Sequence, residues 1–302
     1  MSILKKFLLF LSRNGKIRRI VEKRKKILGV ERFVAGETIE EALNQVEHLN
    51  KQGFSCTLDY LGENTVTRED ASLATMVCID LLQGIAQRQA NCNISLKLTQ
   101  LGLDIDSVFC EENLCNILEE AQRVGVFIRI DMEDYVRLQP TLALFNKLVH
   151  TYANMGTVIQ AYLYRSLHDV NQLRNYSLRL VKGAYLEDQG VAFRRKKDTD
   201  EQFKQMIALH LTQGAYTAIA THDPKIIEFT LSYVKKHQFS LDGYEFQMLY
   251  GIRPDLQRRI LAEGEKIRLY VPFGRDWYGY FLRRLAERPA NLWFVVKGIF
   301  KK

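Results

Sequence analysis

Five charged residues lie within, or at the ends of, short runs that are otherwise apolar: Lys97, Arg129, Asp131, Arg179 and Lys182. A charge placed inside a strand is costly unless it is paired or holds a ligand. A fixed cation there can bind a substrate carboxylate or stabilise negative charge that develops during a reaction. Their grouping predicts a reactive site, although Asp131 could also neutralise Arg129 or Lys97 in a purely structural pair.

Two adjacent arginines near the C-terminal end form a second candidate binding group. Arg283 and Arg284 belong to an aromatic segment, and Tyr280 stands one helical turn before Arg284. Guanidinium forks match the two oxygens of a carboxylate, so the pair could grip one substrate carboxylate from neighbouring angles. The alternative is a surface pair close to a helix C-terminus, where cations interact favourably with the helix dipole.

Eight β-rich runs, each followed by a helical pattern, must position these groups. The runs begin 20 to 40 residues apart, as β-α units require, at residues 54–60, 94–98, 127–131, 158–163, 178–182, 217–221, 244–249 and 267–271. Helical patterns cover residues 68–89, 106–123, 199–213 and 224–238, and Asp223-Pro224 is a helix-start signal. This arrangement predicts an α/β fold, a distorted (βα)8 TIM-type barrel with extra helices before the first strand. A doubly wound parallel sheet is the alternative, but the sequence holds no G-x-G-x-x-G fingerprint of a Rossmann nucleotide fold.

In such a barrel, reactive groups gather at the carboxyl ends of the strands. The residues at these ends include Lys97, Asp131, Met132, Glu133, Gln160, Arg179, Lys182, Thr221, His222, Asp223, Glu245, Gln247 and Tyr270. Arg179 and Val181 share one strand face whereas Lys182 takes the other, so one of the two cations could be structural.

The positive charge of the chain is concentrated in its first thirty residues. The net charge is +8, and residues 1–30 hold ten Lys/Arg against one acid, which leaves 33 basic and 34 acidic residues elsewhere. Apolar residues recur in this arm at helical spacing, as in an amphipathic helix lying on an anionic membrane surface. A solvated or docked N-terminal helix is the equal alternative. We therefore divide the chain into a basic arm, residues 1–30, and one barrel domain, residues 31–302. A neutral globule with a basic arm does not fit a nucleic-acid-binding enzyme.

The cysteines and the clustered carboxylates of the sequence argue against disulfide bonds and metal sites. The five cysteines are odd in number and include no C-x-x-C pair, which is typical of buried thiols in a reducing cytoplasm. The carboxylates at 131–134 alone would supply too few oxygen ligands for a metal ion, so we expect no metal site. No apolar stretch is long and uninterrupted enough for a transmembrane helix.

Five motifs in the barrel region resemble those of one family, the FAD-dependent proline dehydrogenases. They are LVKGAY at 180–185, preceded by Arg179, then ATHD at 220–223, EFQMLYG at 245–251, YVPFG at 270–274 and YFLRRLAE at 280–287. A single hexapeptide would be weak, but the motifs occur in the family's order over residues 30 to 295. The length resembles that of the stand-alone bacterial form, and only the basic arm lies outside the resemblance.

The resemblance implies a reaction that composition and spacing do not supply. It implies oxidation of L-proline to Δ1-pyrroline-5-carboxylate by hydride transfer to N5 of FAD, with electrons passed to a membrane quinone, as the first step of proline degradation. The basic arm would then bring a cytoplasmic enzyme to an anionic membrane surface as a peripheral protein.

The resemblance also assigns roles to residues of this chain. Asp131 and Arg179 are expected to be catalytic, Arg179 as the cation near the flavin N5. Lys97, steadied by Asp131, together with Tyr270, Arg283 and Arg284, is expected to bind the substrate. Residues expected to contact FAD are Met132, Gln160, Arg179, Val181, Lys182, Gly183, Thr221, His222 and Glu287, with Gly183 allowing close approach.

Two other classes of function remain open from the residues themselves. A Schiff-base or other cofactor-free barrel enzyme acting on a small carboxylate would use Lys97 or Lys182 as a buried amine. A non-catalytic protein of the membrane surface would use only the arm. An oxidised-flavin absorption spectrum of the purified protein would exclude both.

Overall fold

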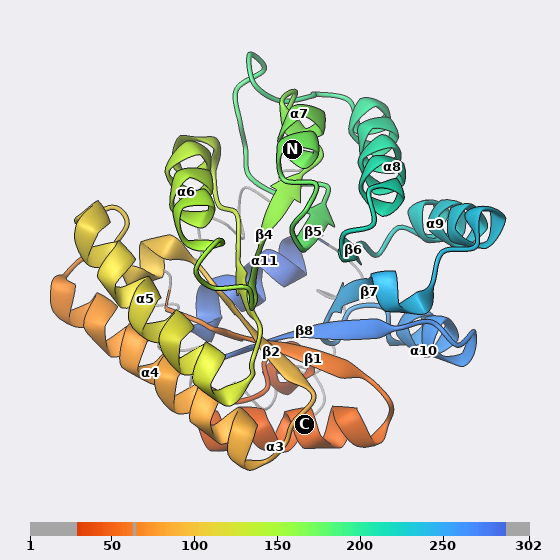
Figure 1. Ribbon diagram of the computed structural model, residues 1–302. Helices are drawn as coiled ribbons and strands as arrows, with labels where there is room; N and C mark the ends of the chain where they lie inside the picture. Colours follow the sequence, from red (N-terminus) through yellow and green to blue (C-terminus); the bar gives the residue numbers. More distant parts are fainter. Residues whose placement is uncertain (1–28, 63–64, 288–302) are drawn as a thin grey trace.

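Eight parallel strands close into a barrel in sequence order in the computed structural model, which describes residues 29–62 and 65–287 (Figure 1). The strands are β1 (Ser55–Tyr60), β2 (Cys92–Leu96), β3 (Ile128–Ile130), β4 (Met155–Gln160), β5 (Leu178–Val181), β6 (Thr217–Ala220), β7 (Tyr244–Leu249) and β8 (Ile267–Phe273). Each strand pairs with its neighbours in parallel, and β8 closes the barrel on β1. The predicted eight-stranded barrel is confirmed, and the doubly wound sheet is excluded.

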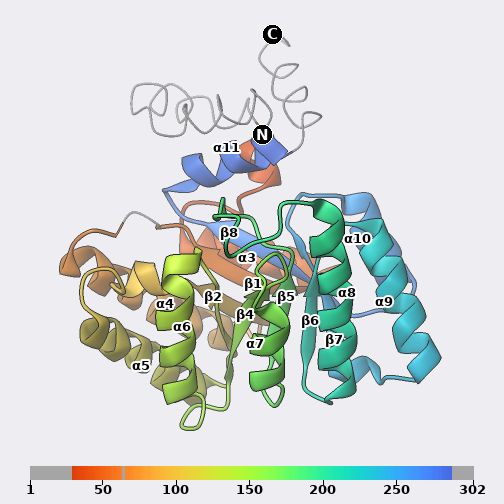
Figure 2. The same ribbon diagram turned by 90° about the horizontal axis from the view of Figure 1, so that it is seen from above.

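Helices surround the barrel wall, and one lies over its end. The α-helices are α3 (Ile39–Lys51), α4 (Arg68–Gln87), α5 (Ser107–Val124), α6 (Tyr135–Leu148), α7 (Ser166–Gln172), α8 (Lys196–Thr212), α9 (Pro224–His237), α10 (Pro254–Ala262) and α11 (Trp277–Glu287), with 3-10 turns η1 (Val30–Arg32), η2 (Leu98–Leu101) and η3 (Leu241–Gly243). Figure 2 shows α11 above the barrel end at which β8 finishes, whereas α6, α7 and α8 run along the wall. The elements η1 and α3 precede β1, as expected for helices added before the first strand.

Aspartates at helix starts explain several of the helix boundaries. Asp106 accepts hydrogen bonds from the backbone N–H groups of Val108 and Phe109, so α5 begins one residue later than its sequence pattern suggests. Asp223 caps α9 in the same way, with Pro224 in the first turn. These caps end the loops that carry the polar groups at the carboxyl ends of the strands.

The alternation of side chains along the strands separates an apolar outer layer from a polar interior. On β3, Ile128 and Ile130 are fully buried in the main hydrophobic core, whereas Arg129 between them joins the polar interior. On β5, Leu178 and Leu180 likewise pack outward and Arg179 inward. The hydrophobic core therefore lies between strands and helices, which leaves the barrel interior to polar groups.

A second, smaller hydrophobic cluster fixes α11 over the barrel end. It joins Trp277 and Phe281 of α11 to Phe33 next to η1, to Leu61 after β1 and to Ile252 after β7. Packing against three separate loops holds this helix in place. Among the described residues, no helix is both long and apolar enough to cross a membrane. The predicted arm lies almost wholly outside the described residues.

Candidate active site

Asp131 is the centre of a buried polar network at the carboxyl end of the strands. It follows β3 directly, and its backbone N–H donates to the carbonyl oxygen of Leu96, 2.8 Å away. One carboxylate oxygen accepts from Nη1 of Arg179 at 2.6 Å, and the other accepts from the hydroxyl of Tyr270 at 2.7 Å. The strands β3, β5 and β8 thus each supply one member of a single contact group.

Arg179 is held on three sides. Besides Asp131, its Nη2 donates to the hydroxyl of Ser95 at 2.8 Å and its Nε donates to Oε1 of Gln247 at 2.5 Å. The guanidinium carbon also lies 5.3 Å from the centre of the Tyr270 ring. With only 5% of its surface exposed, Arg179 is a fixed buried cation rather than a surface charge.

Lys97 belongs to the same network through a residue that the sequence analysis missed. Its Nζ lies 3.3 and 3.4 Å from the two carboxylate oxygens of Asp59 and 3.7 Å from Oδ2 of Asp131. Asp59 is almost fully buried on β1. The signal that singles out the other strand charges, a charged residue inside an apolar run, applies equally to Asp59. The expectation that Asp131 steadies Lys97 is therefore incomplete, because Asp59 makes the shorter contacts.

A second group of charged residues lies further into the barrel interior, near the starts of β7 and β8. Glu245 accepts from Nε of Arg268 at 2.8 Å and from Nε2 of Gln247 at 2.5 Å. Burial raises the pKa of Glu245, but the charge of Arg268 and the hydrogen bonds donated to the carboxylate lower the pKa by more than burial raises it. The net shift is therefore downward, and the carboxylate stays ionised. Glu245, expected among the groups at the strand ends, instead forms a buried ion pair.

Arg129 also belongs to this deeper part of the interior and is not paired with Asp131. Its guanidinium donates to the carbonyl oxygens of Thr157 and Ser177 at 3.0 and 2.7 Å. Burial, followed by the repulsion of Arg179, lowers the pKa of Arg129. Gly156 leaves the space that this side chain fills, because a Cβ at position 156 would lie within 2.4 Å of Nη1.

Among the described residues, the buried charges of the interior are of both signs. The cations are Lys97, Arg129, Arg179 and Arg268, and the carboxylates are Asp59, Asp131, Glu245 and Glu133, whose charge acts on Lys97. Fixed cations among these groups can stabilise an anionic ligand or a negative charge that develops in the site.

Tyr270 presents its hydroxyl to the network as a hydrogen-bond donor. Burial, followed by the charge of Asp131, raises the pKa of Tyr270 well above its ordinary value. The phenol therefore stays protonated over the physiological range. It can hold the Asp131 carboxylate while its ring forms part of the wall beside Arg179.

Gln160, at the end of β4, offers a buried acceptor. Its Nε2 donates to the carbonyl oxygen of Glu133 at 3.1 Å, but its Oε1 has no hydrogen-bond partner among the described residues. Only 3% of Gln160 is exposed, so this oxygen lacks solvent as well. Buried polar atoms without partners are rare, and this one is suited to an N–H group of a bound molecule. Met132 is buried beside Asp131, and Val181 on β5 is half-buried.

Gly183 is required by a neighbouring side chain. Its φ of +102° favours glycine, and an added Cβ would lie 2.2 Å from Cδ1 of Tyr162. The Tyr162 ring is therefore one structural reason for a glycine at this position.

Lys182 is separated from the central network, as the strand alternation suggests. Its Nζ pairs with Oδ2 of Asp223 at 2.6 Å and with Oδ1 of Asp200 at 2.5 Å. Lys196 pairs with the same two aspartates, so two lysines and two aspartates form a closed ring of charges. Of Arg179 and Lys182, it is therefore Arg179 that faces the barrel interior, and Lys182 lies at the rim near the starts of α8 and α9.

Thr221 and His222 follow β6 at the same rim. The hydroxyl of Thr221 accepts from the backbone N–H of Asp223 at 3.1 Å. Nε2 of His222 accepts from the backbone N–H of Leu249 at 2.9 Å, which assigns the ring proton to Nδ1. Both residues therefore also help to shape the loops after β6 and β7.

The expected carboxylate clamp lies on α11, over the barrel end. Arg283 and Arg284 are half-buried, and the guanidinium carbon of Arg284 lies 4.9 Å from the centre of the Tyr280 ring. This cation–π contact across one helical turn fits the spacing noted in the sequence. Glu287 is the last residue of α11, and its side chain lies outside the described part of the chain.

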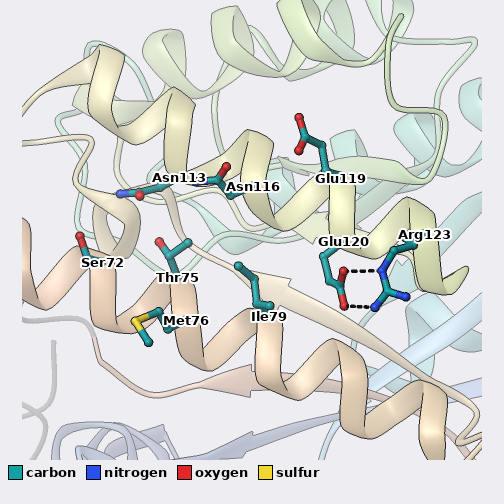
Figure 3. Close-up of a pocket in the computed structure, with 9 residues that line it drawn as sticks. All are labelled: Ser72, Thr75, Met76, Ile79, Asn113, Asn116, Glu119, Glu120 and Arg123. Carbon is teal, nitrogen blue, oxygen red and sulfur yellow. Dashed lines mark hydrogen bonds and ion pairs between the residues drawn. The ribbon is translucent and has the colours of Figure 1, made fainter.

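A groove between α4 and α5 lies on the outer wall, away from these groups. Figure 3 shows Thr75, Met76 and Ile79 on one side and Asn113 and Asn116 on the other. None of the residues of the polar network lines it. Within the described ranges, no group of three or more His, Cys, Asp or Glu side chains is arranged to hold a metal ion.

Comparison with known proteins gives a consistent result. The profile of the family described as proline dehydrogenase matches residues 42–297. The chain is 46% identical to proline dehydrogenase 1 of Bacillus subtilis (strain 168) over 302 residues, which cover 99% of this chain and 100% of that protein. It is 42% identical to the proline dehydrogenase of Deinococcus radiodurans over 278 residues, 90% of each chain.

Solved structures show the same fold. The crystal structure of proline utilization A from Bdellovibrio bacteriovorus, inactivated by N-propargylglycine, superposes with a TM-score of 0.83 at 24% identity. The match covers 94% of this chain and 36% of that longer protein. At this identity the likeness bears on the fold alone, and it agrees with the closed barrel.

Proposed function

The chain belongs to the proline dehydrogenase family, and from that premise we propose that it oxidises L-proline to Δ1-pyrroline-5-carboxylate with FAD as cofactor and a membrane quinone as acceptor. The matches to the Bacillus relatives run along their full length, as for stand-alone enzymes of this family. The observation that carries the proposal is the buried network of Arg179, Asp131, Tyr270 and Lys97 at the carboxyl ends of the strands.

The residues present fit a flavin. The buried Oε1 of Gln160 lacks a partner among the described residues and could accept from an N–H edge of an isoalloxazine ring. Arg179 is a buried cation held in place by hydrogen bonds. Met132 and Val181 would add apolar contacts, and Lys182, Gly183, Thr221, His222 and Glu287 are proposed to bind the remainder of FAD.

The bound flavin would take up the hydride that proline loses and pass the electrons on. Arg179 would stabilise the negative charge that the site gains, because its guanidinium is preorganised by Asp131, Ser95 and Gln247. Asp131 would act through Arg179 and Lys97, holding both cations in place without itself moving a proton.

Proline binding would use cations from two elements. Arg283 and Arg284 on α11 would bind the carboxylate, with Lys97 from the barrel. Tyr270 would pack over the ring while its hydroxyl remains on Asp131. Because α11 lies over the barrel end, it would also limit the access of water to the bound substrate.

The lysines of the site do not favour Schiff-base chemistry. A nucleophilic amine must be free to attack a carbonyl carbon, whereas Lys97 forms ion pairs with Asp59 and Asp131, and Lys182 forms ion pairs with Asp200 and Asp223. This arrangement supports roles for both lysines as binding cations.

The arm would bring the enzyme to its lipid-soluble acceptor. Residues 1–30 hold nine more positive than negative charges on an apolar helical stripe, and the rest of the chain is nearly neutral. Basic residues next to an anionic bilayer contribute about 1 kcal/mol each. We therefore place the enzyme in the cytoplasm, associated with the membrane surface through this arm.

The proposal is tested by an absorption spectrum with and without L-proline. The purified protein, or protein reconstituted with FAD, should show the bands of oxidised flavin, and anaerobic L-proline should bleach them. D-proline is a suitable control because it presents the same groups with the opposite hand. A colourless protein that cannot be reconstituted, or a flavin spectrum that L-proline leaves unchanged, would contradict the proposal.

A further inference from the structure

Gln247 links the two charged layers of the barrel interior. Its Oε1 accepts from Nε of Arg179 at 2.5 Å, and its Nε2 donates to Oε1 of Glu245 at 2.5 Å. Only 3% of Gln247 is exposed, so solvent cannot replace either contact. The amide therefore bridges the reactive layer to the ion pair beneath it.

The neighbours of Gln247 fix which way its amide points. The Nε–H of an arginine can only donate, and an ionised carboxylate can only accept. A flipped amide would place its NH2 group against Arg179 and its oxygen against Glu245, which would break both contacts. The orientation is thus dictated by Arg179 above and Glu245 below.

Glu245 is itself anchored to the barrel wall. Nε of Arg268 lies 2.8 and 3.1 Å from its two carboxylate oxygens, and Nη1 of Arg268 donates to the carbonyl oxygen of Cys56 at 2.8 Å. The Arg268 charge helps to keep the pKa of Glu245 low despite burial, which raises it. The chain of contacts therefore ends on a backbone group of β1, which cannot swing away.

Small residues on β6 allow Gln247 and Arg179 to meet. In the register of the sheet, Ala218 stands between Arg179 and Glu245, and Ala220 stands between Val181 and Gln247. These alanines are the inward residues of the strand that separates β5 from β7. A larger side chain at either position would fill the space that the hydrogen bond from Arg179 to Gln247 crosses.

We propose that Gln247, oriented by Glu245 and Arg268, is a positioning residue that holds the Arg179 guanidinium in the place where it stabilises the reduced flavin. The inference rests on the proposed function, because the effect is read on FAD. Gln247 acts only through Arg179, whose two remaining hydrogen bonds, to Asp131 and Ser95, leave Nε unrestrained when the amide is lost.

The first test is the reduction potential of the FAD-loaded Gln247→Met variant. Methionine has a similar length but neither accepts from Arg179 nor donates to Glu245. A hydrogen bond to a charged group changes an equilibrium constant by roughly tenfold or more. We expect the equilibrium constant for flavin reduction to fall about tenfold, a shift of ~30 mV to lower potential for a two-electron couple. The turnover rate should fall by a similar factor, with a smaller change in the Kd for L-proline.

A matched control separates positioning from loss of structure. Gln257 of α10 is as deeply buried and donates two hydrogen bonds, to the carbonyl oxygens of Leu249 and Ile252, without contacting the network. Gln257→Met should lower thermal stability and leave the flavin potential unchanged. If Gln247→Met fails to fold, Gln247→Asn, which keeps the amide but shortens its reach, takes its place with the same expected direction.

A double-variant cycle tests the route of the effect. In an Arg179→Met background, Gln247→Met should shift the potential no further, because the group that it positions is gone. Equal shifts in both backgrounds would overturn the proposal, as would a potential unchanged in Gln247→Met or shifted equally in Gln257→Met. A wild-type chain that does not bind FAD would instead overturn the proposed function, so the two failures are distinguishable.

Discussion

Replacing Asp59 by asparagine tests whether the buried network depends on this carboxylate, which contacts Lys97 more closely than Asp131 does. Asp59 lies on β1 with 2% of its surface exposed, and both of its carboxylate oxygens are within 3.4 Å of Nζ of Lys97. Asparagine has nearly the same shape but carries no charge. The variant Asp59→Asn therefore removes the compensating charge and little of the packing.

The expected loss follows from the contacts that remain. Removing one partner of a buried ion pair costs about 3–5 kcal/mol, because the other charge stays buried without compensation. Here Asp131 remains 3.7 Å from Nζ, although it is shared with Arg179 and Tyr270. We therefore expect the lower end of that range, about 3 kcal/mol in the free energy of unfolding, or about 5 °C in Tm. The KM for proline should rise, because Lys97 is less firmly held.

The assay is denaturant and thermal unfolding of matched variants. Asp242→Asn is a control, since it breaks the ion pair with Lys266 at a carboxylate whose side chain is 89% exposed, and it should have little effect. The pair Asp59→Asn with Lys97→Met should recover part of the lost stability, because the uncompensated charge is then absent. An Asp59→Asn variant as stable as wild type, or a double variant no more stable than Asp59→Asn, would refute the reasoning.

Four further predictions concern the substrate, the arm and pH. Arg284→Met should weaken proline binding by about 2–5 kcal/mol while FAD is retained; unchanged affinity in a proline titration would remove Arg284 from the clamp. Wild type should prefer L-proline to trans-4-hydroxy-L-proline by roughly tenfold to a hundredfold in kcat/KM, because the additional hydroxyl would be buried against Tyr270 without a hydrogen-bond partner. The variant Tyr270→Ser should reduce that preference. Deleting residues 1–25 should leave activity with a soluble dye near normal and reduce co-sedimentation with anionic vesicles; equal sedimentation would contradict the tether. His210 of α8 is fully buried beside Thr217, and burial lowers its pKa to about 4. The unfolded chain binds the proton already near pH 6.5, so the free energy of unfolding should fall as the pH falls from about 6.5 toward 4. At pH 5 this loss is about 2 kcal/mol relative to pH 8, and it should be absent in His210→Gln.

The strands and helices could be read from the sequence because their signals are local. Four of the eight strand starts were placed at the observed residue, at Leu178, Thr217, Tyr244 and Ile267. The runs at 94–98 and 158–163 were shifted by two or three residues, since their apolar character continues into the turns that follow β2 and β4. The inward-facing position of Arg179 and the separate position of Lys182 also followed from the alternation of a strand.

Several residues of the site needed the closed barrel to be recognised. Asp59 carries the same signal as the other strand charges, but only its contact with Lys97, 38 residues away, identifies it as a partner. In the sequence, nothing distinguishes Gln247 from the other polar residues at strand ends. Only the structure shows that it contacts Arg179, across the small alanines of β6. At Gly183, only the structure shows that the Tyr162 ring lies where a side chain would be.

The sequence by itself determined that this chain forms an eight-stranded barrel with charges inside its strands, and its ordered motifs determined the family. Both follow from local patterns, in which side chains alternate every second residue along a strand and recur each turn along a helix. Only the tertiary structure decided which of the charged and polar groups pair. The hydrogen bond from Tyr270 to Asp131 joins residues 139 apart, and that from Arg179 to Gln247 joins residues 68 apart. Such contacts depend on barrel closure, on strand register and on the small residues that leave space, and none of these can be read from the identity of the paired residues.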